Sequence, residues 1–134
     1  MRNFRNTRAY LSDVKYNFNK KIEQKVDIHF QDYLNIEEIK DDVILCKITR
    51  SIIFVPSDKT IKDTNEMQVS FLANIFLNQR VSAEEFKKDV KTGLDVLNPV
   101  FEMLSLTISN LTVNSVWGPI ITIPTYHEDD IIIS

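Results

Sequence analysis

Few residues in this sequence could do chemistry, and they lie in different parts of the chain. The two histidines, His29 and His127, are too far apart in sequence to form a paired metal site or a catalytic triad at a recognisable spacing. The acidic run from His127 to Asp130 could bind a cation weakly, but we expect a solvated acidic tail. The two glycines, Gly93 and Gly118, cannot form a glycine-rich phosphate loop. We therefore expect no catalytic residue, no metal site and no cofactor, and an enzyme is the least favoured class.

The single cysteine, Cys46, also lacks the setting of a reactive thiol. It lies between Ile44 and Ile48 in a β-like run, which predicts a small buried hydrophobe. One cysteine cannot form an internal disulfide, and this favours a reducing compartment. No apolar run approaches the ~18 residues of a membrane span, and no signal peptide is recognisable. We expect a cytoplasmic protein without membrane insertion.

The remaining signal is apolar and lies in an irregular segment near the C-terminus. Its large apolar residues are Val116, Trp117, Ile120, Ile121 and Ile123. Gly118, Pro119 and Pro124 interrupt the segment, so no regular element would bury all of these side chains. They either cover the sheet as ordinary core or form an exposed patch for an unfolded or extended partner. The residues alone favour the first interpretation.

A helix from Pro99 to about Val113 precedes this segment, with Asn98 as the expected N-cap. Its apolar arc covers more than half of the circumference, whereas a surface helix needs a stripe of only ~100°. We assign one row to the protomer's own sheet: Phe101, Leu104, Ile108 and Leu111. We assign a second row to an interface with another subunit: Met103, Leu106, Asn110 and Val113. The helix therefore predicts an oligomer.

The elements before this helix alternate with a period of two, which is typical of strands. We expect four strands, over residues 7–18, 26–31, 42–55 and 66–80, with a polar connector at 34–42. Ser82 and Glu85 then form a capping box that starts a helix. Strands followed by helices predict one α+β domain over residues 1–134, a four-stranded antiparallel sheet with helices packed on one face.

The net charge of −3 conceals an uneven distribution. Residues 1–21 carry six basic side chains and only one acid, Asp13, while no lysine or arginine follows Leu94. A nucleic-acid-binding arm is one interpretation of the basic end. Because the basic residues alternate within a strand pattern, we favour the solvent side of a first strand and expect no nucleic-acid partner.

Several stretches, in this order, resemble the SecB family of export chaperones. They are RAYLSDVKYNF from Arg8, DDVILCKITRSIIFV from Asp41, FLANI from Phe71, NPVFEMLSLTISNL from Asn98 and GPIITIP from Gly118. The resemblance spans about Arg8 to Tyr126. It implies a four-stranded antiparallel sheet backed by a long helix, assembled as a dimer of dimers, a homotetramer. It also implies an ATP-independent holdase that binds unfolded polypeptides on hydrophobic grooves and serves protein transport.

This resemblance turns the apolar residues 116–123 into expected client-binding residues. The family also docks the SecA motor through acidic positions, of which Asp13 matches one. Asn17 and Asn74 stand at the others, so we do not expect SecA to bind. The alternative function is an oligomeric interaction or scaffold protein, of phage or toxin–antitoxin association, that has the fold without a general export role.

Overall fold

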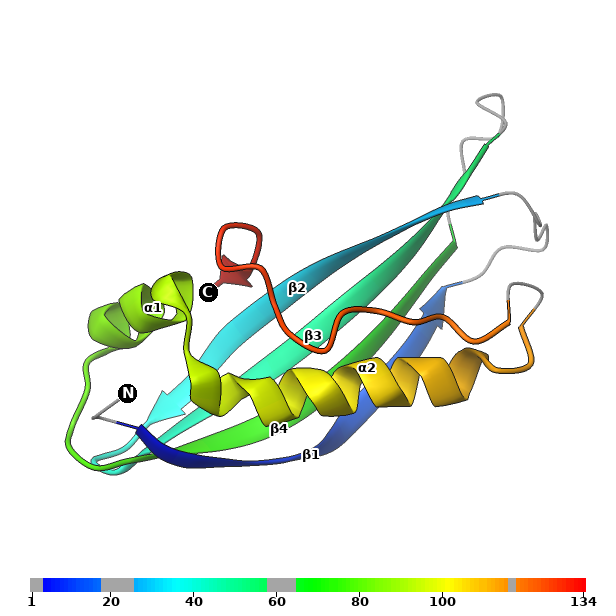
Figure 1. The fold of residues 1–134 in the computed structure, drawn as a ribbon. Helices are drawn as coiled ribbons and strands as arrows, with labels where there is room; N and C mark the ends of the chain where they lie inside the picture. The colour runs from blue at the N-terminus through cyan, green and yellow to red at the C-terminus, as the bar shows by residue number, and fades with distance from the viewer. Residues whose placement is uncertain (1–3, 18–25, 58–64, 116–117) are drawn as a thin grey trace.

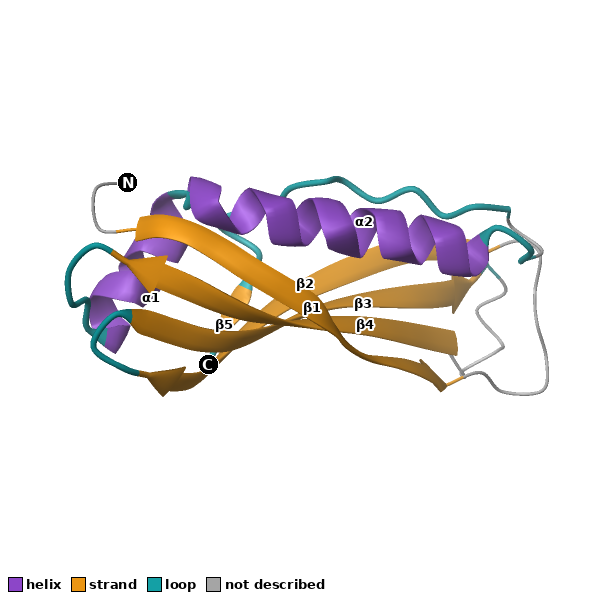
Figure 2. Ribbon diagram, turned by 90° about the horizontal axis from the view of Figure 1, so that it is seen from below, coloured by secondary structure: helices purple, strands orange, loops and turns teal. Residues whose placement is uncertain are grey.

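The computed structural model describes residues 4–17, 26–57, 65–115 and 118–134. They form a long twisted sheet with the helices on one of its faces (Figure 1, Figure 2). The elements are β1 (Phe4–Asn17), β2 (Val26–Ile39), β3 (Val43–Pro56), β4 (Asn65–Leu77), α1 (Ala83–Thr92), the 3-10 turn η1 (Asp95–Leu97), α2 (Asn98–Thr112) and β5 (Ile132–Ile133). The fold is α+β, as the order of strands and helices predicted.

The sheet has five strands in the order β1-β4-β3-β2-β5, not the four that the sequence predicted. The first four pair antiparallel, whereas β5 pairs parallel with β2, so the sheet is mixed. The fifth strand comes from the tail, residues 127–134. The amide of Ile36 donates to the carbonyl of Ser134 at 2.9 Å, and the amide of Ser134 donates to the carbonyl of Leu34 at 2.9 Å. β-branched residues favour such an edge position.

Most of the expected polar connector at 34–42, up to Ile39, is instead the second half of β2. Leu34 lies opposite Ile48 and Ile36 opposite Cys46, so this half of the strand covers the core like the first half. The pairing register shifts between Ile36 and Glu38, which is the mark of a β-bulge. The acidic residues of this stretch concealed its alternation in the sequence. At the other end of the pattern, β4 ends at Leu77 and not at residue 80.

The two central strands form the floor of the core. Alternate side chains of β3 and β4 are buried toward the helices, and α2 packs on them through Val100, Phe101, Leu104 and Ile108. Leu111, which we assigned to the same row, is 44% exposed because it lies to one side of this buried face. Asn98 is helical and does not cap α2, because the chain enters from η1 and Leu97 takes the cap position.

The start of α1 follows the sequence prediction. The amide of Glu85 donates to the Ser82 hydroxyl oxygen at 3.2 Å, so Ser82 is the N-cap of α1, and the Ser82 hydroxyl also donates to the Glu85 carboxylate at 3.2 Å. Phe86 and Val90 are the buried side chains of this helix. They anchor α1 near one end of the sheet (Figure 1).

Candidate functional site

After α2 the chain turns back and runs beside the helix as an extended strap, residues 118–126, which we call the return segment (Figure 1). Hydroxyl groups of α2 hold it in place. The amide of Ile120 donates to Thr112 Oγ1 at 2.8 Å, and Ser105 Oγ donates to the carbonyl of Thr122 at 2.8 Å. These bonds satisfy backbone groups that no regular element serves.

A buried arginine holds the middle of the return segment. Arg50, on β3, is 0% exposed, and it donates two hydrogen bonds to the carboxylate of Asp32 across the β2–β3 pair, at 2.7 and 2.8 Å. Its other donors bond Thr122 Oγ1 at 2.9 Å and the carbonyls of residues 123 and 125 at 2.5 and 2.8 Å. The rings of Phe30 and Phe101 lie 4.7 and 5.4 Å from the guanidinium carbon. A buried charge needs such complete pairing.

Tyr126 fastens the end of the return segment. Its hydroxyl accepts the amide of Leu94 at 2.8 Å and donates to the carbonyl of Val90 at 2.7 Å, and its ring stacks on Phe101 at 4.9 Å. Burial raises the pKa of the Tyr126 hydroxyl above its ordinary value, although the amide bond acts in the opposite direction. The return segment is thus attached at its start, middle and end.

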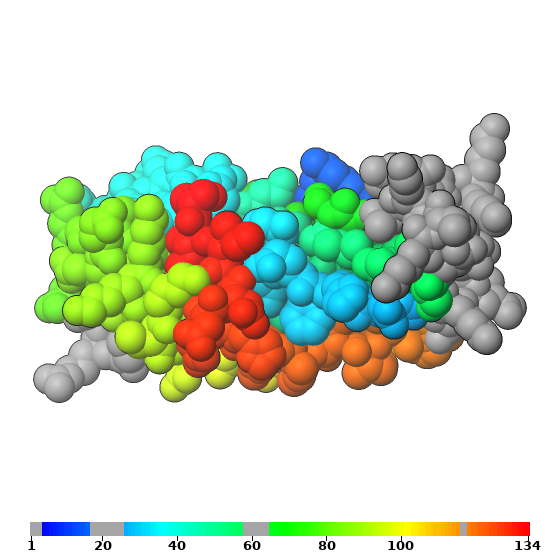
Figure 3. Space-filling view, turned by 90° about the horizontal axis from the view of Figure 1, so that it is seen from above, coloured from blue at the N-terminus to red at the C-terminus, as the bar shows by residue number. Residues whose placement is uncertain are grey.

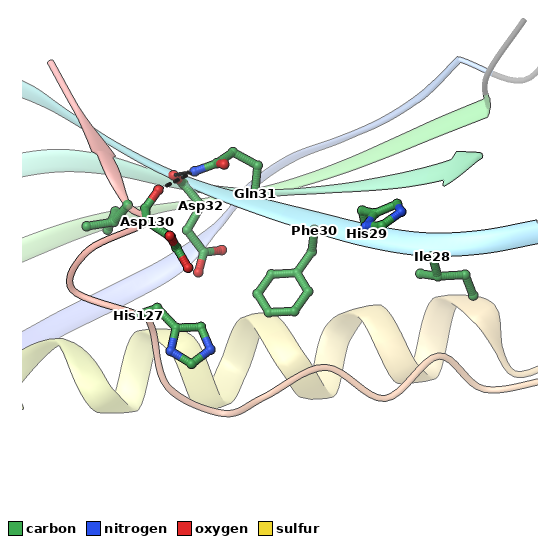
Figure 4. A pocket seen from close by; sticks show the side chains of 8 residues that line it. Ile28, His29, Phe30, Gln31, Asp32, His127 and Asp130 are labelled. Carbon is green, nitrogen blue, oxygen red and sulfur yellow. Dashed lines mark hydrogen bonds between the residues drawn. The ribbon is translucent and has the colours of Figure 1, made fainter. Parts of the chain in front are cut away.

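A groove lies between β2 and the tail, residues 127–134, which are side by side on the surface in Figure 3; Figure 4 shows the groove from close by. It has a volume of about 270 Å³, and its lining comprises the β2 residues Ile28, His29, Phe30, Gln31 and Asp32 and the tail residues His127, Asp130 and Ile131. Figure 4 shows Ile28 and Phe30 pointing toward α2 and His29 pointing to the other side of the strand. Because Phe30 stacks on Arg50, its ring is held in place at the base of the groove.

The backbone of β2 is open beside this groove. Within the described part of the chain, β2 pairs on its outer side only with β5, at Tyr33 and Leu34. Leu34 and Ile36 direct their backbone groups to β5. Because alternate residues of a strand face the same edge, the N–H and C=O groups of Ile28 and Phe30 also point outward. An exposed strand edge of this kind is a template for another strand.

The predicted client-binding residues differ in how far the structure exposes them. Val116 and Trp117 lie outside the described residues. Ile120 is only 6% exposed and belongs to the core of the protomer, because its amide is bonded to α2 and its side chain points inward. Ile121 is 77% exposed and Ile123 is half-buried. Of these three isoleucines, Ile121 and Ile123 are therefore accessible at the surface, whereas Ile120 is not.

The four residues predicted to face another subunit lie on the side of α2 that points away from the sheet. Leu106 is 62% and Val113 is 53% exposed, Asn110 is exposed, and Met103 is half-buried. Met103 packs partly against the core, whereas Leu106 and Val113 have little cover within the described part of the chain. Its role as an interface remains a prediction.

The predicted motor-docking residue, Asp13, does not present a free carboxylate. Asp13 Oδ2 lies 3.6 Å from the ammonium group of Lys47 and 3.8 Å from that of Lys15. Both neighbours offset its charge on this face of the sheet. Asn74 lies opposite Arg8, so the cross-strand neighbour at the second position is basic as well.

The described residues contain no group of three or more histidine, cysteine, aspartate or glutamate side chains placed to hold a metal ion. Cys46 is buried between β-strands, and burial raises the pKa of its thiol to about 12, with Glu37 acting in the same direction. Among the described helices, none has the length and apolarity that crossing a membrane requires.

Comparison with known proteins identifies the fold. No protein-family model matches the sequence, and no curated protein does. The structure is similar to that of the Rv1957 SecB-like chaperone of Mycobacterium tuberculosis, solved in complex with a ChAD peptide from the Rv1956 HigA1 antitoxin. The TM-score is 0.58 at 11% identity, over 92% of this chain and 86% of that one. A protein of unknown function from Streptococcus agalactiae matches with a TM-score of 0.39 at 13% identity, covering 87% and 92% of the two chains. The fold of this chain is SecB-like.

Proposed function

We propose that this protein is an ATP-independent chaperone that binds extended segments of unfolded polypeptides along β2. The observation that carries this proposal is the open β2 edge at Ile28 and Phe30, next to a groove with apolar side chains at its base. Main-chain hydrogen bonds to a strand edge bind any extended sequence, and the apolar side chains of Ile28 and Phe30 beside this edge add selectivity for hydrophobic segments. Ile121 and Ile123 extend the apolar surface on the return segment.

The SecB-like fold supports the same role. The mycobacterial neighbour is a chaperone in complex with an antitoxin peptide, so antitoxin-type segments are one client class to test beside exported proteins. No arrangement among the described residues favours the scaffold alternative over client binding, because the groove that a scaffold would lack is present here.

We also propose that the exposed row of α2 is covered by a second copy of the chain in a dimer of dimers. Leu106 and Val113 form an apolar row that a monomer would leave in water. In the described sheet β1 pairs on one side only, with β4, and its residues Tyr10, Leu11 and Tyr16 are exposed. Both features suit a symmetric assembly, in which the same surface on each copy is covered.

Light scattering tests the chaperone function. At one oligomer per client molecule, the protein should slow the aggregation of several chemically unfolded proteins without ATP. Ile28→Asp should weaken this protection, because it places a charge at the base of the groove. Ile28→Val, which keeps an apolar β-branched side chain at the same position, is the matched control and should keep the protection. A wild-type protein that protects none of the clients would refute the proposal.

A further inference from the structure

The tail occupies the same strand edge that we assign to clients. Its last residues form β5, which runs parallel to β2 and is bonded at Leu34 and Ile36. Before β5, the side chain of Gln31 donates to the carbonyl of Asp130 at 2.6 Å, and Lys91 donates to the carbonyl of Ile131. The tail therefore docks as an added strand whose polar contacts go mainly to its backbone.

This docking rests on few contacts compared with that of the return segment. β5 has only two residues, and short parallel pairs are among the weaker elements of a sheet. Ile131 is the one fully buried side chain of the tail, Ile132 is 50% exposed, and residues 127–130 are all exposed. In contrast, the preceding residues are bound by Arg50 and Tyr126. The firmly attached part of the chain thus ends at Tyr126.

A client strand longer than the open part of the β2 edge cannot share that edge with the tail. A client that pairs with Ile28 and Phe30 and continues along β2 in the direction of the tail would meet Asp130 and Ile131, which line the same groove. We propose that the segment from Asp130 to Ser134 is an intramolecular ligand of the β2 edge, and that an extended client replaces it. This inference rests on the proposed function.

The sequence of the tail also describes the client segment that replaces it. Ile131 fills an apolar site at the edge of the core, and its neighbours Ile132 and Ile133 have the β-branched side chains that fit a strand. A client with two or three successive β-branched residues, entering parallel to β2, matches the same backbone groups.

Three forms of the chain test the proposal: the intact protein, a chain that ends at Asp129, and a Tyr33→Cys/Ile132→Cys variant. Residues 33 and 132 are paired neighbours and are both exposed, so an oxidised pair locks the tail in place. Cys46 is buried and does not interfere. The probe is fluorescein-labelled carboxymethylated α-lactalbumin, a permanently unfolded protein, and binding is followed by anisotropy.

If the tail is docked in about 90% of molecules, its removal should tighten client binding about tenfold. The oxidised pair should bind the probe more weakly than the same variant after reduction, and the Tyr33→Cys single variant should not respond to reduction. A synthetic peptide of residues 127–134 should compete with the probe on the shortened chain. Where the shortened chain loses its circular dichroism, the comparison of the oxidised and reduced pair decides.

Equal binding of the probe by the oxidised and reduced pair would overturn the tail proposal and leave the proposed function standing. Absence of binding in all three forms would overturn the proposed function itself, and client replacement with it. The two failures are therefore distinguishable in one set of titrations.

Discussion

At the scale of single residues, Arg50 decides how the return segment is held. Its charge is fully buried and pairs with Asp32, while its other donors bind the hydroxyl of Thr122 and the carbonyls of residues 123 and 125. The sequence placed Arg50 within a strand but did not predict its burial, because its cross-strand partner lay in a second strand of unknown register. A buried salt bridge leaves no periodicity signal of its own.

Arg50→Met should lower the free energy of unfolding by about 3–5 kcal/mol, because it leaves the Asp32 carboxylate buried without a partner. Chemical denaturation measures this loss. The double variant Arg50→Met/Asp32→Leu should recover part of it, since no orphan charge remains. A loss below about 1 kcal/mol for Arg50→Met would contradict the structural role of this pair.

Cys46 makes the stability depend on pH in the alkaline range. The folded thiol keeps its proton up to about 12, whereas the unfolded thiol ionises at its ordinary value of 9.0, so the folded state binds more protons between these limits. The free energy of unfolding should therefore fall as pH rises above about 9, by up to ~1.4 kcal/mol per pH unit from this group. Denaturation from pH 8 to 10.5 should show a steeper fall for the wild type than for Cys46→Ala. Parallel curves would refute the assignment.

At the scale of elements, the sequence predicted those whose pattern is local. The capping box at Ser82, the strand pattern of β3 and the proline-started helix were all recognisable, because caps and periodicity belong to one segment. The second half of β2 and the two-residue strand β5 were not recognisable in the sequence. Both owe their strand form to a neighbour across the sheet, which no local pattern records.

Helix α2 separates the core of the protomer from the proposed interface. Leu104→Ala should cost about 2–5 kcal/mol in the free energy of unfolding, because it leaves a cavity under a fully buried side chain. Leu106→Glu should cost little in the protomer, where Leu106 is 62% exposed. In an assembly it would bury an unpaired charge, so the protein should dissociate while it keeps its far-UV circular dichroism. Sedimentation velocity checks this, and an intact assembly of Leu106→Glu would show that this row is no interface.

At the scale of the whole molecule, the order of the strands in the sheet creates the candidate site. Sequence alternation predicted the strands but not which of them lie at an edge, so the predicted client-binding residues, within 116–123, do not include the β2 edge. In the sequence this edge is marked only by the apolar alternation of Val26, Ile28 and Phe30. A strand with neighbours on both sides would show the same alternation. Only the three-dimensional sheet shows that these residues face an open side.

The face of the sheet that carries Asp13 should not recruit SecA. Lys15 and Lys47 lie within 4 Å of its carboxylate, and a charged patch acts mainly by steering and salt-sensitive attraction. Calorimetry with the zinc-bearing tail of SecA should give no measurable heat. The variant Lys47→Ala/Asn74→Asp serves as the comparison, because it adds acidic character to the same face. Micromolar binding by the wild type would restore an export role.

Hydrogen exchange at the β2 edge tests the central claim most directly. The amides of Ile28 and Phe30 point away from β3 within the described sheet and should exchange rapidly in the free protein. A saturating unfolded client should slow both of them, while the outward amides of β1 remain unchanged. Ile28→Pro, which removes one edge donor without breaking the pairing with β3, should abolish the protection of Phe30. Client binding that leaves both amides unprotected would contradict the assignment of the client site to β2.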